Sequence, residues 1–467
     1  MNRPPAALHD ASATELLELY EAGRASPVEA VQAVIEHIGR WEPHLGATYA
    51  FDPEAALAMA RESEARWRRG EARALEGVPV MIKENIATRG VPVPLGTAAT
   101  ELVPAAEDAP PAARLREAGC VFLGKTTMPD YGMLSSGLSS FHPLTRNPWD
   151  LAKTPGGSSS GAGAGAAAGY GPLHLGTDIG GSVRLPAGWC GLFTLKPSLG
   201  RIPIDPPYPA RVAGPMTRTV QDAAAMMAPL TLPDARDHMS LPYQPLEWRQ
   251  LDRDVRGLRL GLLLDAGWGL PVQPQVREAV VAAARALEAA GAIVEPVAPW
   301  AERSMIEGID RFWRARFCVE MRKLSEERRE RVLPFIRAWA EGGAGWSGEE
   351  LYEAYAQTLA LRAATVAATQ PYDYVLSPTA PIPAFAAELP CPTHDVARPF
   401  EHIAFTLPYN MSEQPAASIN CGYTSDGLPI GLQIAGRRFD DLGVLQMARA
   451  WERMRPAQRP WPRPPGP

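Results

Sequence analysis

The sequence lacks the segments that mark secreted and membrane-spanning proteins. It contains no run of roughly 18 apolar residues, and the stretch Met1–Asp10 has no apolar core of the kind found in a signal peptide. Its few cysteines form no CxxC pair, which is typical of free, buried thiols in a reducing compartment. They are Cys120, Cys190, Cys318, Cys391 and Cys421. We therefore expect a cytoplasmic protein with no membrane partner and no disulfide scaffold.

The sequence also lacks concentrated charge and clustered metal ligands. The net charge is −6, and the 46 lysines and arginines are scattered along the chain, which argues against nucleic acid as a partner. The eight histidines show no ligand spacing, so we expect neither a metal nor another cofactor.

What the sequence does have is the composition of a large soluble enzyme. Its 467 residues are 46% hydrophobic, and no glycine- or serine-rich linker divides the middle. We expect one domain over residues 1–454. The tail, residues 455–467, contains six prolines and is predicted to be disordered.

Helix and strand signals alternate along the chain. Ser26, Pro27 and Glu29 give an N-cap, a first-turn proline and a capping box for a helix reaching about Ile38. We expect further helices over 113–117, 164–168 and 276–290, and strands over 77–83, 120–123, 174–177, 258–264, 293–297, 374–376 and 430–434. This order predicts the α/β class.

Two short motifs suggest other enzymes but lack the structural context that those enzymes need. Residues 119–126 fit the P-loop pattern, yet the four internal residues are apolar and a helix is predicted just before them, so we interpret the stretch as a buried strand. Residues 157–161 fit the GxSxG pattern, with Ser159 as nucleophile and His394 or His402 as base. A strand must lead into such a turn, and a stretch with two prolines stands there instead.

A longer pattern places hydroxyl groups between glycines in two segments, residues 156–161 and 176–184. From composition alone it fits either a reactive site or a pair of structural turns. The stretch from Pro155 to Lys196 resembles the amidase signature family, whose members cleave amides through a Ser-Ser-Lys triad. The resemblance extends to residues 77–85, 414–417 and 426–433, and so covers most of residues 70–450. It implies a single domain with a mixed, twisted sheet between helical layers, a catalytic core at about 70–220 and a variable, helix-rich, substrate-pocket region at about 300–370.

The resemblance assigns roles to individual residues. The family's lysine corresponds to Lys83, its relay serine, entered through a cis peptide, to Ser158, and its nucleophile to Ser182; the separations of 75 and 24 positions agree with the family's. The oxyanion hole would use the backbone N–H groups of Ile179, Gly180, Gly181 and Ser182, and Gly132 would give a backbone contact to substrate. Departures from the family's usual residues occur at Glu84, Asp130, Tyr131 and Ser160, outside the triad.

Neighbouring residues are expected to shape and support the site. Tyr131, Met133, Leu134, Phe312, Trp313 and Phe317 indicate a pocket for an apolar acyl or aryl group. Asp178 and Arg184 bracket Ser182 and are expected to form a structural pair, with Thr177 bracing the same loop.

A serine hydroxyl is a weak nucleophile, and a lysine can activate it only when the amine is neutral, as burial favours. We therefore expect an amidohydrolase that acts on a small-molecule carboxamide and releases a carboxylic acid and an amine or ammonia. A carbamate or ester hydrolase, the glutaminase subunit of a tRNA-dependent amidotransferase, and a non-catalytic interaction protein are the alternatives. A homodimer is compatible with the sequence.

Overall fold

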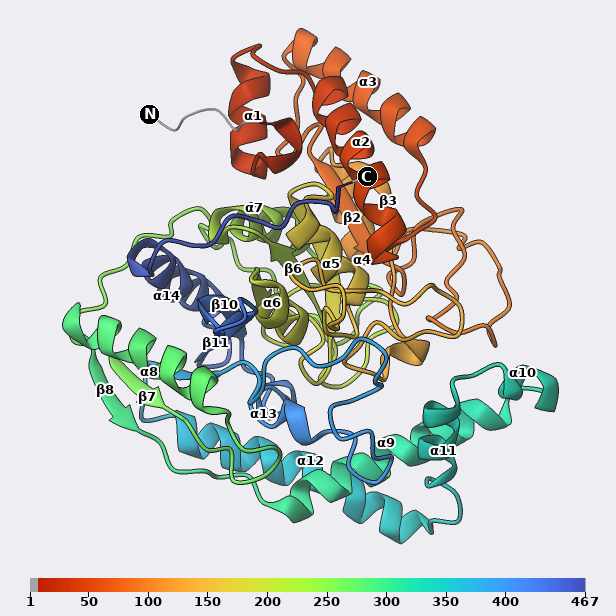
Figure 1. Cartoon of the computed structure of the whole chain (residues 1–467), viewed down its shortest axis with the longest axis vertical. Coiled ribbons are helices and arrows are strands. Elements are labelled where there is room, and N and C mark those ends of the chain that lie inside the picture. Colours follow the sequence, from red (N-terminus) through yellow and green to blue (C-terminus); the bar gives the residue numbers. More distant parts are fainter. Residues whose placement is uncertain (1–6, 467) are drawn as a thin grey trace.

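The computed structural model describes residues 7–466 (Figure 1). The first six residues of the expected domain and Pro467 of the expected tail lie outside the described residues. Within the described part, all five cysteines are unpaired and buried, as predicted. None of the helices described there is long and apolar enough to cross a membrane.

One mixed sheet of eleven strands runs through the described part of the chain, in the order β1-β3-β2-β4-β6-β5-β10-β11-β9-β7-β8. The strands are β1 (Thr48–Tyr49), β2 (Pro79–Lys83), β3 (Val121–Thr126), β4 (Leu173–Asp178), β5 (Phe193–Lys196), β6 (Val212–Thr217), β7 (Arg259–Leu262), β8 (Ile293–Pro296), β9 (Tyr374–Pro378), β10 (Ala416–Tyr423) and β11 (Pro429–Gly436). Strand β2 runs parallel to β3 and β4, whereas β6 runs antiparallel to β4. The carboxyl ends of β2 and β4 therefore meet the start of β6 at one edge of the sheet.

Helices cover both faces of this sheet. They are α1 (Ala13–Glu21), α2 (Pro27–Leu45), α3 (Pro53–Arg69), α4 (Pro110–Glu117), α5 (Ser160–Ala168), α6 (Arg184–Cys190), α7 (Val220–Leu230), α8 (Pro274–Ala289), α9 (Arg303–Arg322), α10 (Glu326–Glu330), α11 (Pro334–Glu341), α12 (Gly348–Thr369), α13 (Leu407–Met411) and α14 (Asp441–Met454). Helices α4, α7, α8 and α14 share one apolar core with the sheet. Helices α2, α3, α5, α6, α9 and α11 form the cores on the other side. The predicted α/β sandwich is confirmed.

Local sequence explains why several of these elements form. Helix α2 begins with the capping box of Ser26 and Glu29 and ends at Gly46 in the left-handed conformation, one turn or more beyond the predicted Ile38. All five residues of β2 are buried, as expected for a central strand with helices on both faces. In α5, a Cβ on Gly161 would lie 2.3 Å from the Ala47 carbonyl oxygen, so only glycine fits there.

The proline-rich tail has no helix or strand, but it lies against the rest of the chain (Figure 1). The Trp461 ring is 6.0 Å from that of Trp149, the Arg218 guanidinium lies 4.5 Å from the Trp461 ring centre, and Arg463 pairs with Asp10 at 3.4 Å. Disorder was predicted here from the proline content. That content gives no information about the contacts of a single tryptophan, Trp461.

Candidate active site

Lys83 is the last residue of β2, and its side chain is completely buried. Its Nζ lies 2.8 Å from Ser158 Oγ and 3.5 Å from the Thr177 carbonyl oxygen. Burial, together with the positive charge of Arg211, lowers the pKa of Lys83 well below its usual value. The neighbouring carboxylate of Glu84 pairs with His142. No carboxylate of the described residues lies within 4.0 Å of the lysine amine.

Ser158 lies in the loop before α5 and is reached through a cis Gly157–Ser158 peptide. A Cβ on Gly157 would lie 2.6 Å from the Leu134 carbonyl oxygen, so the loop requires glycine at this position. The backbone N–H of the next residue, Ser159, donates to the Ser182 carbonyl oxygen at 3.1 Å. This bond joins the segment that carries Ser158 to the segment that carries Ser182.

Ser159 has a different environment from the other two serines. It is fully buried, and its Oγ lies 3.3 Å from the Thr177 carbonyl oxygen and 3.4 Å from the Thr177 backbone nitrogen. His402 is buried with its ring stacked on Trp189. No strand leads into residues 157–161, so the GxSxG interpretation has no structural basis. Residues 119–126 fold as β3 with its preceding turn rather than as a phosphate-binding loop.

Ser182 occupies the loop between β4 and α6, called here the Ser182 loop, where it and Ile179 are the partly exposed residues. The backbone N–H of Gly181 donates to Asp178 Oδ1 at 2.8 Å and is therefore engaged within the loop. The N–H groups of Ile179, Gly180 and Ser182 have no acceptor among the described residues. Three of the four expected oxyanion donors are thus free to bind an oxygen atom.

Asp178 and Arg184 form a completely buried ion pair, with Arg184 Nη2 3.0 Å from Asp178 Oδ1. Burial alone would raise the pKa of Asp178, but the charge and hydrogen bonds of Arg184 outweigh it and hold that pKa below its usual value. Asn410 donates to the same carboxylate at 2.8 Å, and Arg184 also donates to the Thr406 carbonyl oxygen at 2.9 Å. The expected pair therefore anchors the Ser182 loop to α13. Thr177 contributes through its backbone and through a 3.1 Å bond from Asn85.

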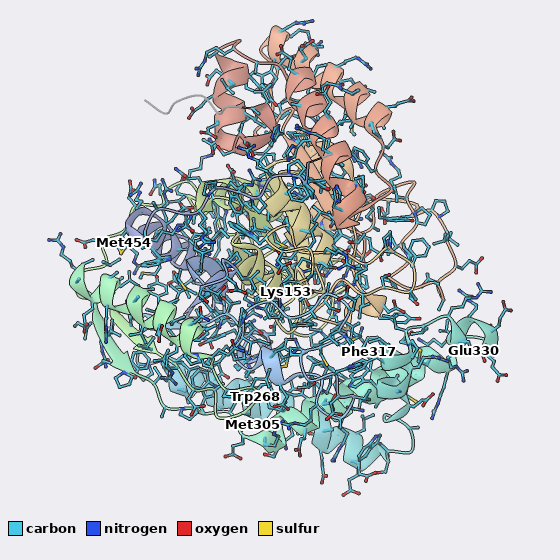
Figure 2. The ribbon with its side chains drawn as sticks, viewed as in Figure 1. Lys153, Trp268, Met305, Phe317, Glu330 and Met454 are labelled. Atoms are coloured by element: carbon cyan, nitrogen blue, oxygen red, sulfur yellow. The ribbon has the colours of Figure 1, made fainter. Side chains whose placement is uncertain are left out.

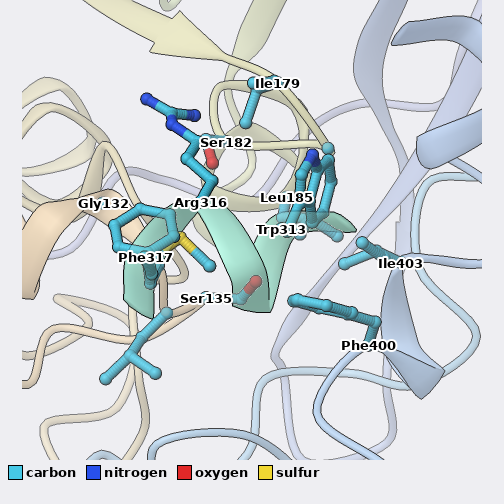
Figure 3. A pocket seen from close by; sticks show the side chains of 13 residues that line it. Gly132, Ser135, Ile179, Ser182, Leu185, Trp313, Arg316, Phe317, Phe400 and Ile403 are labelled. Atoms are coloured by element: carbon cyan, nitrogen blue, oxygen red, sulfur yellow. The ribbon is translucent and has the colours of Figure 1, made fainter. Parts of the chain in front are cut away.

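A pocket of about 480 Å³, including its open mouth, lies over Ser182 (Figure 3). It is lined by Gly132, Met133, Leu134, Ser135, Ile179, Gly180, Ser182, Leu185, Trp313, Arg316, Phe317, Phe400 and Ile403. Most of these side chains are apolar, and no aspartate or glutamate is among them. Within the described residues, no group of three or more histidine, cysteine, aspartate or glutamate side chains could hold a metal ion.

The pocket contains some of the expected residues and omits others. Gly132, with φ of +68°, lies so close to Ser158 that an added Cβ would be 3.2 Å from Ser158 Oγ. Tyr131 does not line the pocket but packs edge-on against Phe317 at 5.9 Å, and Phe312 contacts Tyr355 instead. In Figure 2, Phe317 lies nearer the middle of the molecule than Glu330, which lies at the outer edge.

Several pocket residues were not predicted from the sequence. Arg316 shares a helix face with Trp313 through the spacing of three residues, and that periodicity was a usable signal. Ile403 ends a short 3-10 helix, Glu401–Ile403, and Phe400 precedes that helix. So short an element has no sequence periodicity that indicates a direction for the side chains.

A mixed sheet between helices, with a buried lysine beside a serine and a second serine in a glycine-rich loop, defines a hydrolase site. The family described as Amidase matches residues 29–445, and the chain belongs to this family of amidase signature enzymes. These enzymes are hydrolases that act on carbon–nitrogen bonds.

Two groups of relatives illustrate the range of the family. The chain is 34% identical to a Glutamyl-tRNA(Gln) amidotransferase subunit of Myxococcus xanthus, over 96% of this chain and 97% of that protein. The corresponding subunit of Chloroflexus aggregans is 33% identical over 93% and 94%. Among solved structures, a bacterial aryl acylamidase of the amidase signature family superposes with a TM-score of 0.89 at 30% identity, covering 96% of each chain. A 6-aminohexanoate cyclic dimer hydrolase complexed with substrate gives 0.86 at 27% identity, over 96% of this chain and 98% of that one.

Proposed function

We propose that this chain hydrolyses a small carboxamide through an acyl-enzyme on Ser182, with Ser158 as proton relay and Lys83 as base. The observation that carries the proposal is the completely buried Lys83 amine, 2.8 Å from Ser158 Oγ. The hydrogen bond from Ser159 to the Ser182 carbonyl oxygen supports it, because that bond holds the relay segment against the Ser182 loop.

Attack requires a neutral base, and the surroundings of Lys83 favour the neutral amine. Burial penalises the ammonium form, and the charges of Asp178 and Glu84 oppose this effect only in part, since no carboxylate of the described residues lies within 4.0 Å of the amine. As the Ser182 oxygen bonds to the substrate carbonyl carbon, its proton passes to Ser158 while the Ser158 proton passes to Lys83. The carbonyl oxygen becomes an oxyanion, for which the free N–H groups of Ile179, Gly180 and Ser182 are suitable donors.

Breakdown of this intermediate returns the proton. Lys83, now an ammonium, gives a proton back through Ser158 to the leaving nitrogen, the carbon–nitrogen bond breaks, and an amine or ammonia departs. A water molecule then attacks the ester of Ser182 with the same base, and the carboxylic acid is released. In each half of the cycle Lys83 takes up one proton and gives one back. The Ser182 proton leaves with the amine, and a proton of the attacking water returns to Ser182, so the enzyme ends unchanged.

The residues that line the pocket favour some substrates over others. Its apolar lining suits an aliphatic or aryl group, and the same attack would open a carbamate or an ester. Free glutamine carries an α-ammonium group, and the pocket lining offers no aspartate or glutamate to bind it. This absence favours a free-standing hydrolase over a glutaminase component of a larger complex, the alternative raised by the relatives named as amidotransferase subunits.

Active-site labelling tests the proposal. A fluorophosphonate should modify Ser182, as located by peptide mapping, and Ser182→Ala should lose both labelling and amide hydrolysis. Modification of Ser159 instead would contradict it. The purified chain should hydrolyse apolar anilides without a partner and should act poorly on glutamine; activity that appears only with glutamine and a copurified partner would favour the amidotransferase alternative.

A further inference from the structure

One arginine lines the pocket and a second lies beside the Ser182 loop, and neither has the acidic partner that many arginines of this chain have. Arg316 lines the pocket beside Ser182, and in Figure 3 its side chain extends from the helix toward the same wall as Ser182 and Ile179. On the same helix, Arg314 pairs with Asp310 at 2.8 Å, whereas no carboxylate of the described residues lies within 4.0 Å of Arg316. Arg316 is thus a free cation in a pocket that contains no acid.

The second arginine reaches the site from the sheet. Val212 at the start of β6 pairs with Asp178 at the end of β4, so the preceding residue, Arg211, stands across from Ile179 of the Ser182 loop. Its Nη1 donates to the Pro206 carbonyl oxygen at 3.1 Å, and no carboxylate lies within 4.0 Å among the described residues.

Tyr208 connects the two arginines. The Arg316 guanidinium carbon lies 3.9 Å from the centre of the Tyr208 ring, and the Arg211 backbone N–H donates to the Tyr208 carbonyl oxygen at 3.0 Å. Stacking on the ring restrains the Arg316 side chain while leaving its N–H groups available in the plane of the guanidinium.

The two positive charges affect each other. Burial lowers the pKa of Arg211 to about 10, and the charge of Arg316 adds to this effect, while Asp205 opposes it. An arginine guanidinium is cationic at neutral pH, so the two groups repel each other, and an anion bound by both would relieve that repulsion.

We propose that Arg316, assisted by Arg211, binds a carboxylate on the substrate, so that the preferred substrate is an amide with an apolar portion and one carboxylate. The guanidinium fork binds a carboxylate through two parallel hydrogen bonds, and the apolar residues Trp313, Phe317 and Phe400 pack against the remainder. This inference rests on the proposed hydrolase function. The carboxylate belongs either to the acyl group, as in the half-amide of a dicarboxylic acid, or to the leaving amine, as in an N-acylated amino acid.

Matched substrate pairs test it. One pair is glutaric acid mono-p-nitroanilide and pentanoic acid p-nitroanilide, which differ in a carboxylate on the acyl side. The other is N-butyryl-4-aminobenzoate and butyranilide, which differ on the leaving side. In one of the two pairs, the carboxylate compound should have a kcat/KM about 10- to 100-fold higher, because hydrogen bonds to charged groups are among the stronger ones. The preference should weaken with added salt.

Arginine variants test which residue causes the preference for the carboxylate compound. Arg316→Ala should remove most of the preference by raising KM for the carboxylate compound, so that the ratio of kcat/KM within the pair falls toward one. Arg316→Lys should retain part of the preference, and Arg211→Ala should reduce it. Arg322→Ala, at the far end of the same helix, is the control and should change neither compound. Equal kcat/KM for both members of both pairs, or an unchanged preference in Arg316→Ala, would overturn the inference.

A binding measurement separates this inference from the proposed function. In Ser182→Ala, calorimetry should show the carboxylate compound of the preferred pair binding at least tenfold more tightly than its neutral partner, and Arg316→Ala in that background should equalise the two. Turnover of neutral anilides with no carboxylate preference would refute the inference and leave the hydrolase function intact. Carboxylate-selective binding without turnover by the unmodified protein would refute the hydrolase function alone.

Discussion

Lys83 Nζ and Ser158 Oγ lie 2.8 Å apart, although 75 positions separate the two residues in the chain. The end of a buried strand supplies one group, and the loop before α5 supplies the other. Because the amine is completely buried, this contact couples a hydroxyl near the pocket to a base that solvent does not reach.

The pH dependence of catalysis follows from the lowered pKa of Lys83. Burial favours the neutral amine in the folded protein, and only that form accepts a proton. We expect kcat/KM for a neutral anilide to fall as the pH decreases through this lowered pKa. Above that pKa kcat/KM should be constant, and this plateau should begin well below pH 10. A pH–rate profile measures this. An acid limb that lies near pH 10.5, the value of an exposed lysine, would contradict the assignment of Lys83 as a neutral base.

The close approach of Gly132 to Ser158 predicts a selective effect of one methyl group. In Gly132→Ala the new Cβ would lie 3.2 Å from Ser158 Oγ, so the relay serine or the loop must shift, and we expect kcat/KM to fall about 10- to 100-fold. Gly345→Ala is the matched control, because Gly345 also has a positive φ, of +84°, but no atom lies within 4 Å of its added Cβ. Both variants should lose about 1 kcal/mol of stability. Equal activity in the two variants would show that the approach to Ser158 has no catalytic consequence.

The buried pair of Asp178 and Arg184 predicts a large effect on stability. Arg184→Met leaves the Asp178 carboxylate buried without its cation, so we expect a loss of about 3–5 kcal/mol in the free energy of unfolding. The double variant Asp178→Asn with Arg184→Met removes both charges and should be less destabilised than Arg184→Met alone. Urea unfolding followed by circular dichroism measures both. A double variant that is less stable than the single one would indicate that the hydrogen bonds, rather than the uncompensated charge, dominate.

Much of this architecture could be predicted from the sequence, and the reasons are local. Capping residues indicate α2, and buried apolar runs indicate β2 and β3, because each signal lies within or next to the element itself. Strands β6 and β10 were not predicted, since their sequences contain glycine, proline or small residues that become strands only through pairing with neighbours. The four-residue strand β5 was also missed, because so short a run has no clear periodicity.

The features of the site also differ in whether the sequence could predict them. The roles of Lys83, Ser158 and Ser182 could be predicted by resemblance, because each residue lies in a recognisable motif: Lys83 ends the run from Gly77, and the two serines lie in glycine-containing loops. The engagement of Gly181 with Asp178, and the convergence of Arg211 and Arg316 on Tyr208, depend on strand register and helix placement. No residue pattern in a single sequence encodes those distances.

In the proposed mechanism, Lys83 takes the serine proton and returns it to the leaving nitrogen. The most direct measurement compares kcat/KM of Lys83→Ala and the unmodified protein for an anilide and the matching nitrophenyl ester, with the fold verified by circular dichroism. An amine must be protonated to leave, whereas a nitrophenolate needs little help, so the anilide should lose both base and acid assistance. With general acid–base catalysis worth about 10²- to 10⁴-fold, the loss of anilide hydrolysis should far exceed that of the ester. Equal proportional losses would contradict proton return by Lys83, and no loss on either substrate would remove it from the mechanism.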